Sequence, residues 1–295
     1  MSVKTKRVIL ALFLSVFLIF PTAILANTYS SILAFGDSLS DNGKYGMYAD
    51  ALSYTNPFDN FGFYRFSNGP NWVEYLAGPS HFNAKLLDLA YGGATTSGDN
   101  PAAGLTTTGL QWQVATYKAV FGNSISSNTL VTLWAGGNDM FNLRSPITAA
   151  DNIKLAIQNL IAIGGRSFLI PNLSYTDIDP YKYFKQPFDT ELALDLAFLK
   201  ATNPETDIYA LDLNGFVPTG VIDLYGPYTF KNPDPTNETG PYAWWDIVGV
   251  HPTTEVHAQI ADLAAAATEV PEPATMLLLG SGLLGLWGFR KKFKK

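Results

Sequence analysis

The chain has 295 residues, among them 19 Lys and Arg, 25 Asp and Glu, and no cysteine. Without cysteine, the protein has no disulfide, no thiolate metal site and no cysteine nucleophile. The formal net charge of −6 becomes about −13 when the two terminal segments described below are removed. Such an acidic body lacks the basic surface that binds nucleic acid, so we expect no nucleic-acid partner.

The N-terminus has the pattern of a secretory signal peptide. Lys4, Lys6 and Arg7 precede an apolar stretch at residues 8–20, and small residues follow. A basic start, an apolar stretch and then small residues are typical of chains that are exported and cleaved. We predict that signal peptidase removes residues 1–26.

Residues 27–269 alternate between strand-like and helix-like patterns, which predicts one domain. Short apolar runs that end in turns predict strands at 30–35, 130–135, 167–170 and 208–213. Apolar residues at helical spacing predict helices at 148–163, 190–199 and 255–267. This alternation is typical of an α/β fold, here a three-layer α/β/α sandwich around a mainly parallel sheet. In such sheets, binding sites lie beyond the C-terminal ends of the strands.

Two long segments without a periodic pattern interrupt this domain, at 43–69 and 215–242. Long irregular segments in a compact domain are usually functional or poorly ordered. Because both follow predicted strand ends, we expect them to form walls of a substrate site.

Ser38 directly follows the first predicted strand and is the candidate nucleophile. It lies at the expected start of a helix, where backbone N–H groups favour negative charge, although serine is equally typical of an ordinary helix cap there. A serine hydroxyl needs a base to take its proton, and the chain has three histidines. His251 is the candidate base, because it precedes the last predicted helix and follows a nearby carboxylate, Asp246. His81 and His257 are expected to be ordinary surface or core residues.

Two other segments carry candidate hydrogen-bond donors. Gly92 and Gly93 follow an apolar run, and without side chains their backbone can approach a ligand closely. Asn138 follows the strand predicted at 130–135 and offers a side-chain amide. Donors held in place before negative charge develops form an oxyanion hole. In isolation, the glycine pair is just as typical of an ordinary turn.

Together these segments resemble the GDSL family of SGNH hydrolases. Residues 35–43 are similar to the first block of that family, which carries the nucleophile at Ser38. Gly93 matches the glycine of block II, Asn138 the asparagine of block III, and His251 the histidine of block V. The resemblance implies a flavodoxin-like α/β/α fold and a catalytic serine activated by His251. It also implies an oxyanion hole made by the N–H groups of Ser38 and Gly93 and the Asn138 amide, and it implies no metal or organic cofactor.

The chain departs from the family pattern at two positions. The family usually places the triad aspartate three residues before the histidine, where this chain has Val248. Asp246 is five residues before His251, so either a bulge delivers its carboxylate to the ring or a backbone carbonyl orients the ring instead. The second departure is Asp88, where block II commonly has asparagine; we expect it to affect packing more than chemistry.

The C-terminus, residues 270–295, has the pattern of a sorting segment. Pro271-Glu272-Pro273 precedes an apolar stretch at 275–289, and a basic tail closes the chain. As a helix, this stretch would reach about 22 Å against a hydrocarbon core of about 30 Å, which makes it a marginal membrane-spanning helix. The segment resembles the PEP-CTERM sorting signal of Gram-negative bacteria, which implies processing by an exosortase-type enzyme. A simple C-terminal membrane tail is the alternative.

These features predict a secreted serine hydrolase of small-molecule or polymer-borne esters. The substrate is a simple carboxylic ester or an acyl ester of a lipid or polysaccharide. The reaction passes through an acyl-enzyme. Export predicts a periplasmic, cell-surface or matrix location in a Gram-negative bacterium. Two alternatives remain open: a glycan-binding surface protein with weak or no catalysis, and an acyltransferase.

Overall fold

The computed structural model describes residues 29–43, 65–67, 69–102, 107–173, 182–216 and 251–268. The predicted signal peptide, the predicted sorting segment, Asp246 and most of the two long irregular segments lie outside these residues. In the described part of the chain, no helix is long and apolar enough to cross a membrane.

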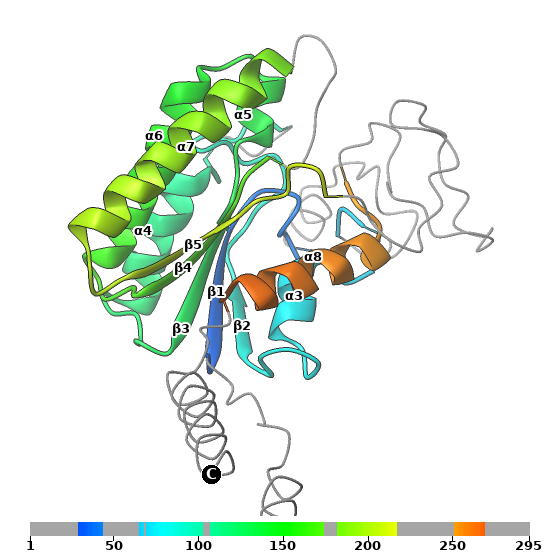
Figure 1. The fold of residues 1–295 in the computed structure, drawn as a ribbon, viewed down its shortest axis with the longest axis vertical. Helices are drawn as coiled ribbons and strands as arrows, with labels where there is room; N and C mark the ends of the chain where they lie inside the picture. The colour runs from blue at the N-terminus through cyan, green and yellow to red at the C-terminus, as the bar shows by residue number, and fades with distance from the viewer. Residues whose placement is uncertain are drawn as a thin grey trace, which may run out of the picture.

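Five parallel strands form one sheet in the order β2-β1-β3-β4-β5 (Figure 1). The strands predicted from short apolar runs are confirmed, with their ends within two residues of the observed ones. Strand β2 was not predicted, because it is a short edge strand whose residues are all at least partly exposed and lack a continuous apolar run. The observed strands are β1 (Ser31–Gly36), β2 (Lys85–Asp88), β3 (Thr129–Trp134), β4 (Ser167–Pro171) and β5 (Asp207–Leu211).

Helices cover both faces of the sheet, which confirms the three-layer α/β/α prediction (Figure 1). One face packs against α4 (Leu110–Phe121), α5 (Gly137–Phe141), α6 (Pro146–Ile161) and α7 (Lys182–Thr202). The other face packs against α3 (Trp72–Ala77) and α8 (Thr254–Thr268).

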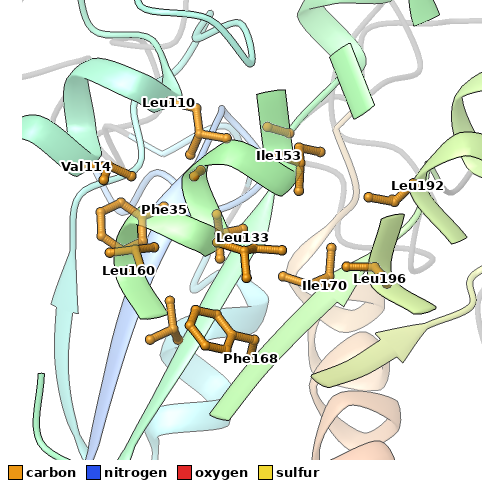
Figure 2. Close-up of a cluster of buried hydrophobic side chains, with 14 of the residues drawn as sticks. Phe35, Leu110, Val114, Leu133, Ile153, Leu160, Phe168, Ile170, Leu192 and Leu196 are labelled. Carbon is orange, nitrogen blue, oxygen red and sulfur yellow. The ribbon is translucent and has the colours of Figure 1, made fainter. Parts of the chain in front are cut away.

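Successive side chains of the strands point to the two layers in turn. Leu33 and Phe35 of β1 belong to the larger core cluster, whereas Ile32 and Ala34 belong to the smaller one. This alternation follows from the two-residue period of a strand. Burying one large apolar side chain contributes about 1.5–3 kcal/mol, so these two clusters are the main source of stability. Figure 2 shows part of the larger cluster, including Phe35, Leu133, Ile153, Leu160, Phe168 and Leu196.

The predicted helices at 148–163, 190–199 and 255–267 are confirmed, but the first two differ from the observed helices by two residues or more at each end. Helix α6 begins at Pro146, because Ser145 caps it by accepting a hydrogen bond from the Thr148 N–H. Helix α7 begins at Lys182 and continues through Pro187. Proline inside a helix removes one backbone hydrogen bond, and α7 forms in spite of this loss. Helices α3, α4 and α5 were not predicted.

The order of the strands reverses between β1 and β3. Strand β1 lies between β2 and β3, so the chain leaves the C-terminal ends of β1 and β3 toward opposite faces. In doubly wound sheets, ligands bind beyond the strand ends at this point, where the strand order reverses. Ser38 follows β1 by two residues, and Asn138 lies in α5 directly after β3.

Gly36 ends β1 where no side chain fits. Its φ is +147°, and an added Cβ would lie 2.2 Å from the Trp134 carbonyl oxygen. Gly122 also has a positive φ, +94°, but nothing lies within 4 Å of an added Cβ there.

Gly36→Ala is therefore expected to lower the free energy of unfolding by about 3 kcal/mol or more, since strain and steric overlap add. The matched control Gly122→Ala should cost about 1 kcal/mol, from strain alone. Urea denaturation of both variants measures the difference. Equal losses would show that the close approach of β1 to β3 tolerates a side chain.

Candidate active site

The structure brings together the two residues predicted as nucleophile and base. Ser38 Oγ lies 2.7 Å from His251 Nε2, although 213 positions separate them in the chain. Ser38 lies in the turn that follows β1, and His251 lies three residues before α8. A base within hydrogen-bonding distance of a hydroxyl is the geometry that proton abstraction requires.

Residues 37–41 form the turn that carries the candidate nucleophile Ser38, and we call it the nucleophile turn. It is anchored to the sheet and to α3. The Asp37 N–H donates to the Trp134 carbonyl (3.2 Å), which extends the β1–β3 pairing by one residue. The Ser40 and Asp41 N–H groups donate to the Asp37 carbonyl and close a single turn. The sequence-based expectation of a helix starting at Ser38 is wrong for residues 38–43, which continue as turn and irregular structure.

Helix α3 contributes two side-chain donors to the same turn. Asn71 caps α3 and donates from Nδ2 to the Ser40 carbonyl (2.7 Å), and the Trp72 indole N–H donates to Ser40 Oγ (3.1 Å). All three side chains are buried. The turn is therefore held by hydrogen bonds from a helix that was not recognised in the sequence.

The segment before α3 supports His251. The Phe66 ring packs against the His251 ring, with centroids 5.0 Å apart. Ser67 Oγ donates to the Pro252 carbonyl (2.9 Å), and Thr254 Oγ1 donates to the Pro70 carbonyl (2.9 Å). These two hydrogen bonds join residues more than 180 positions apart, so no local signal in the sequence reveals them.

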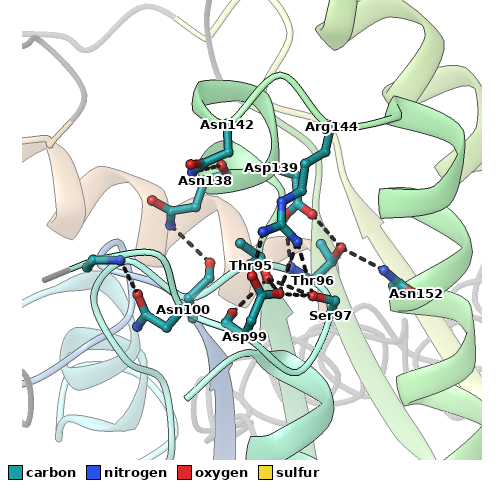
Figure 3. A network of polar contacts seen from close by, with 12 residues as sticks. Thr95, Thr96, Ser97, Asp99, Asn100, Asn138, Asp139, Asn142, Arg144 and Asn152 are labelled. Atoms are coloured by element: carbon teal, nitrogen blue, oxygen red, sulfur yellow. Dashed lines mark hydrogen bonds and ion pairs between the residues drawn. The ribbon is translucent and has the colours of Figure 1, made fainter. Parts of the chain in front are cut away.

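Two of the candidate oxyanion donors come from the loop that carries Gly93 and from α5, which carries Asn138. Gly93 has a φ of +80°, and an added Cβ would lie 2.5 Å from Asn100 Oδ1, so glycine is required there. Asn138 Nδ2 donates to the Ala94 carbonyl (3.0 Å; Figure 3), which ties α5 to the glycine loop. This loop is also tied to the nucleophile turn, because the Gly92 N–H donates to Asp41 Oδ2 (2.8 Å).

Asp88, where block II commonly has asparagine, joins the same two segments. Its Oδ2 accepts from the Asn42 N–H (3.0 Å), and its Oδ1 accepts from the Ala90 N–H (2.9 Å). The Asp88 carboxylate thus connects the segment after Ser38 with the segment before Gly93 by backbone hydrogen bonds.

Asp37, directly before the nucleophile, is a buried carboxyl group. Burial raises its pKa from 3.8 to about 7, while the Leu39 N–H and the nearby His251 act in the opposite direction. Asp139 raises the pKa of Asp37 further, because two buried negative charges repel. Sequence reasoning did not single out Asp37, because the residue before a nucleophile carries no local sign of burial.

The other two histidines differ from His251 in their surroundings. His81 lies between the Tyr75 carbonyl and Asp262 Oδ1, each 2.9 Å from a ring nitrogen. His257 is buried in α8, and burial followed by the proximity of His251 lowers its pKa to about 3. It therefore remains neutral at physiological pH.

Among the described residues, one group of acidic side chains has the spacing of metal ligands. Carboxylate oxygens of Asp151, Glu191 and Asp195, on α6 and α7, lie within 4.8 Å of one another. Lys154 Nζ already pairs with Asp151 (2.8 Å) and Asp195 (2.5 Å). An ammonium group thus supplies the positive charge at this position.

Residues 32–264 match the family model described as GDSL-like Lipase/Acylhydrolase. The chain belongs to this family. Residues 269–292 match the PEP-CTERM protein-sorting motif, so both resemblances noted in the sequence are confirmed. The sorting motif implies export and membrane-associated sorting in Gram-negative bacteria.

Two curated proteins share detectable sequence similarity with this chain. It is 26% identical over 275 residues to the secreted effector protein SseJ of Salmonella typhimurium, covering 80% of this chain and 63% of that protein. It is 29% identical over 154 residues to the phosphatidylcholine-sterol acyltransferase of Aeromonas hydrophila, covering 49% and 44%. The chain spans less than two thirds of the length of either relative.

Solved structures of lipolytic G-D-S-L proteins are also similar to this chain. The structure from Veillonella parvula covers 81% of this chain and 97% of its own, at 16% identity and a TM-score of 0.48. The structure from Desulfitobacterium hafniense covers 81% and 99%, at 13% identity and a TM-score of 0.42.

Asp37→Asn tests the buried carboxyl group beside the nucleophile. The folded-state pKa of about 7 exceeds the ordinary value of 3.8, so the folded protein binds this proton more tightly than the unfolded chain does. Ionising Asp37 therefore lowers stability as the pH rises from about 4 to about 7. The variant keeps the size of the side chain and removes the titration. Its stability relative to wild type should increase across this window, by up to about 4 kcal/mol.

Urea denaturation at about pH 4.5 and about pH 7.5 measures this change. A stability difference between the two proteins that does not vary with pH would contradict the assignment.

Proposed function

We propose that this protein is an exported serine ester hydrolase in which Ser38 is the nucleophile and His251 the general base. The observation that carries the proposal is the 2.7 Å separation of Ser38 Oγ and His251 Nε2 in a chain of a lipase and acylhydrolase family. The loop that carries Gly93 and helix α5, which carries Asn138, are joined through the Ala94 carbonyl, and this contact supports the proposed oxyanion hole.

The reaction follows from these positions. His251 Nε2 takes the hydroxyl proton as Ser38 Oγ attacks the ester carbonyl carbon. The N–H groups of Ser38 and Gly93 and the Asn138 amide stabilise the negative oxygen of the tetrahedral intermediate. The carbon–oxygen bond to the alcohol then breaks, and the alcohol leaves with the proton from His251. Water attacks the acyl-enzyme in the same way and releases the acid.

Asp246 is the proposed third member of this catalytic group. Its carboxylate would accept the second ring N–H of His251 and stabilise the imidazolium that forms. Five residues separate it from His251, two more than the family spacing, so the proposal requires a bulge around Val248. If a backbone carbonyl orients His251 instead, a Ser–His pair carries the reaction.

The substrate is proposed to be an acyl ester carried by a lipid or an exported polysaccharide. The similarity to a protein named phosphatidylcholine-sterol acyltransferase supports a lipid ester, whereas the sorting motif supports a surface polymer. The same relative supports an acyltransferase as the second candidate, because an acyl-enzyme can pass its acyl group to an alcohol instead of water.

The proposal includes processing at both ends of the chain. Residues 1–26 are the proposed signal peptide, 27–269 the hydrolase domain and 270–295 the sorting segment. Signal peptidase and an exosortase-type enzyme are the proposed processing partners. The released domain would act in the periplasm, at the cell surface or in the extracellular matrix.

Ser38→Ala is expected to reduce hydrolysis of a short nitrophenyl ester by at least about 10³-fold, because the acyl-enzyme can no longer form. A fluorophosphonate probe should label the wild-type protein and not this variant. Ser30→Ala, which changes an exposed serine before β1, is the control and should behave as wild type. Wild-type protein that neither hydrolyses esters nor reacts with the probe would instead support a glycan-binding protein. Product analysis with added alcohol distinguishes acyl transfer from hydrolysis.

Asp246→Asn is expected to lower kcat by about 10³- to 10⁴-fold, since the amide would favour the wrong tautomer of His251. The circular dichroism spectrum and KM should stay close to wild type. Unchanged kcat would show that a different group orients the ring.

A further inference from the structure

Two adjacent residues of α5 form hydrogen bonds with the loop that carries Gly93. While Asn138 contacts the Ala94 carbonyl, the Asp139 carboxylate accepts two hydrogen bonds from Thr96 (Figure 3). The Thr96 N–H donates to Oδ2 (2.8 Å), and the Thr96 hydroxyl donates to Oδ1 (2.9 Å). We call this pair, Thr96 and Asp139, the clasp.

The clasp is buried, so its hydrogen bonds are costly to break. Thr96 is 0% exposed and Asp139 is 2% exposed. Burial raises the pKa of Asp139, whereas both hydrogen bonds from Thr96 lower it. A buried carboxylate is tolerated only when donors surround it, and losing one donor costs more than a typical hydrogen bond contributes.

Thr96 also accepts hydrogen bonds from side chains of two further helices. Asn152 Nδ2 of α6 donates to Thr96 Oγ1 (3.2 Å), and Gln111 Nε2 of α4 donates to the Thr96 carbonyl (3.2 Å). The same Gln111 amide donates to the Asn152 carbonyl (2.8 Å). The loop is thus held against three helices at one residue, and a hydrogen-bonded network around a buried side chain such as Thr96 restricts its motion.

The position of the clasp connects it to the proposed chemistry. Thr96 follows Gly93 by three residues, and Asp139 is next to Asn138. An oxyanion hole accelerates a reaction only when its donors are already in place as the negative charge develops. The clasp joins the two chain segments that carry separate donors, so it sets the spacing between them.

We propose that Thr96 and Asp139 are positioning residues, and that their hydrogen bonds set the distance between the Gly93 N–H and the Asn138 amide. This inference rests on the proposed ester hydrolysis and adds residues that touch neither the substrate nor Ser38. The inference assigns this positioning role to the clasp and not to the nearby ion pair of Asp99 and Arg144. That pair is partly exposed, at 45% and 33%, and surface ion pairs contribute little.

The experiment compares Thr96→Val with Thr96→Ser and Asp99→Asn in the processed domain. Thr96→Val keeps the shape of the side chain and removes the hydroxyl, and Thr96→Ser keeps the hydroxyl. Asp99→Asn weakens the exposed ion pair with Arg144 and keeps an oxygen that can accept from the Thr95 and Ser97 hydroxyls. Steady-state hydrolysis of nitrophenyl acetate gives kcat and KM. Inhibition by an alkyl boronic acid, which forms a tetrahedral adduct with the serine, reports on the oxyanion hole independently of turnover.

Thr96→Val should lower kcat about 10- to 100-fold, a smaller loss than deletion of a whole donor, with KM within about twofold of wild type. Boronic acid affinity should fall in proportion to kcat. Thr96→Ser should restore both to within about threefold, and Asp99→Asn should leave both within about twofold. If thermal unfolding shows that Thr96→Val is not folded, Asp139→Asn replaces it, with the same expected losses.

Three outcomes separate the two proposals. An inactive wild-type protein that the fluorophosphonate probe does not label overturns the proposed function, and the positioning role with it. An active wild-type protein with an unchanged Thr96→Val variant overturns only the positioning role. Equal losses in Thr96→Val and Asp99→Asn also overturn it, because general loosening of the loop would then account for both.

Discussion

The parallel pairing of β1 with β3 is the constraint on which the rest of the site depends. Gly36 lies opposite Trp134, and the Asp37 N–H continues the hydrogen bonds of the sheet for one more residue. The nucleophile turn and α5 therefore leave the sheet from the same edge. Because an added Cβ at Gly36 would overlap the Trp134 carbonyl, the two strands approach more closely there than most residues allow.

Buried and partly buried carboxylates organise this edge of the sheet. Asp41 accepts the N–H groups of Gly43 (2.9 Å) and Gly92 (2.8 Å), Asp88 accepts those of Asn42 and Ala90, and Asp139 accepts that of Thr96. Each carboxylate loses hydration on burial and regains hydrogen bonds from loop backbone that has no strand partner. Short acidic side chains thus supply hydrogen bonds to these loops where regular secondary structure does not.

The predictable parts of the fold were those with a strong local pattern. Strand β3 is a continuous apolar run because helices cover it on both sides, and α6 repeats apolar residues at helical spacing, so both were predicted. Strand β2 and the short helices α3 and α5 have too few residues for a periodic pattern. Their positions depend on partners elsewhere, such as β1 for β2 and the nucleophile turn for α3.

By itself, the sequence determined the fold class, the family, the sorting motif and the candidates Ser38 and His251, because periodicity, residue types and short motifs are local properties. Only the tertiary structure decided that these two side chains meet, that Phe66 and Ser67 brace the histidine segment, and that Asp139 holds Thr96. Each of these contacts joins segments far apart in the chain. Their formation depends on how strands and helices pack, and no local pattern records that packing.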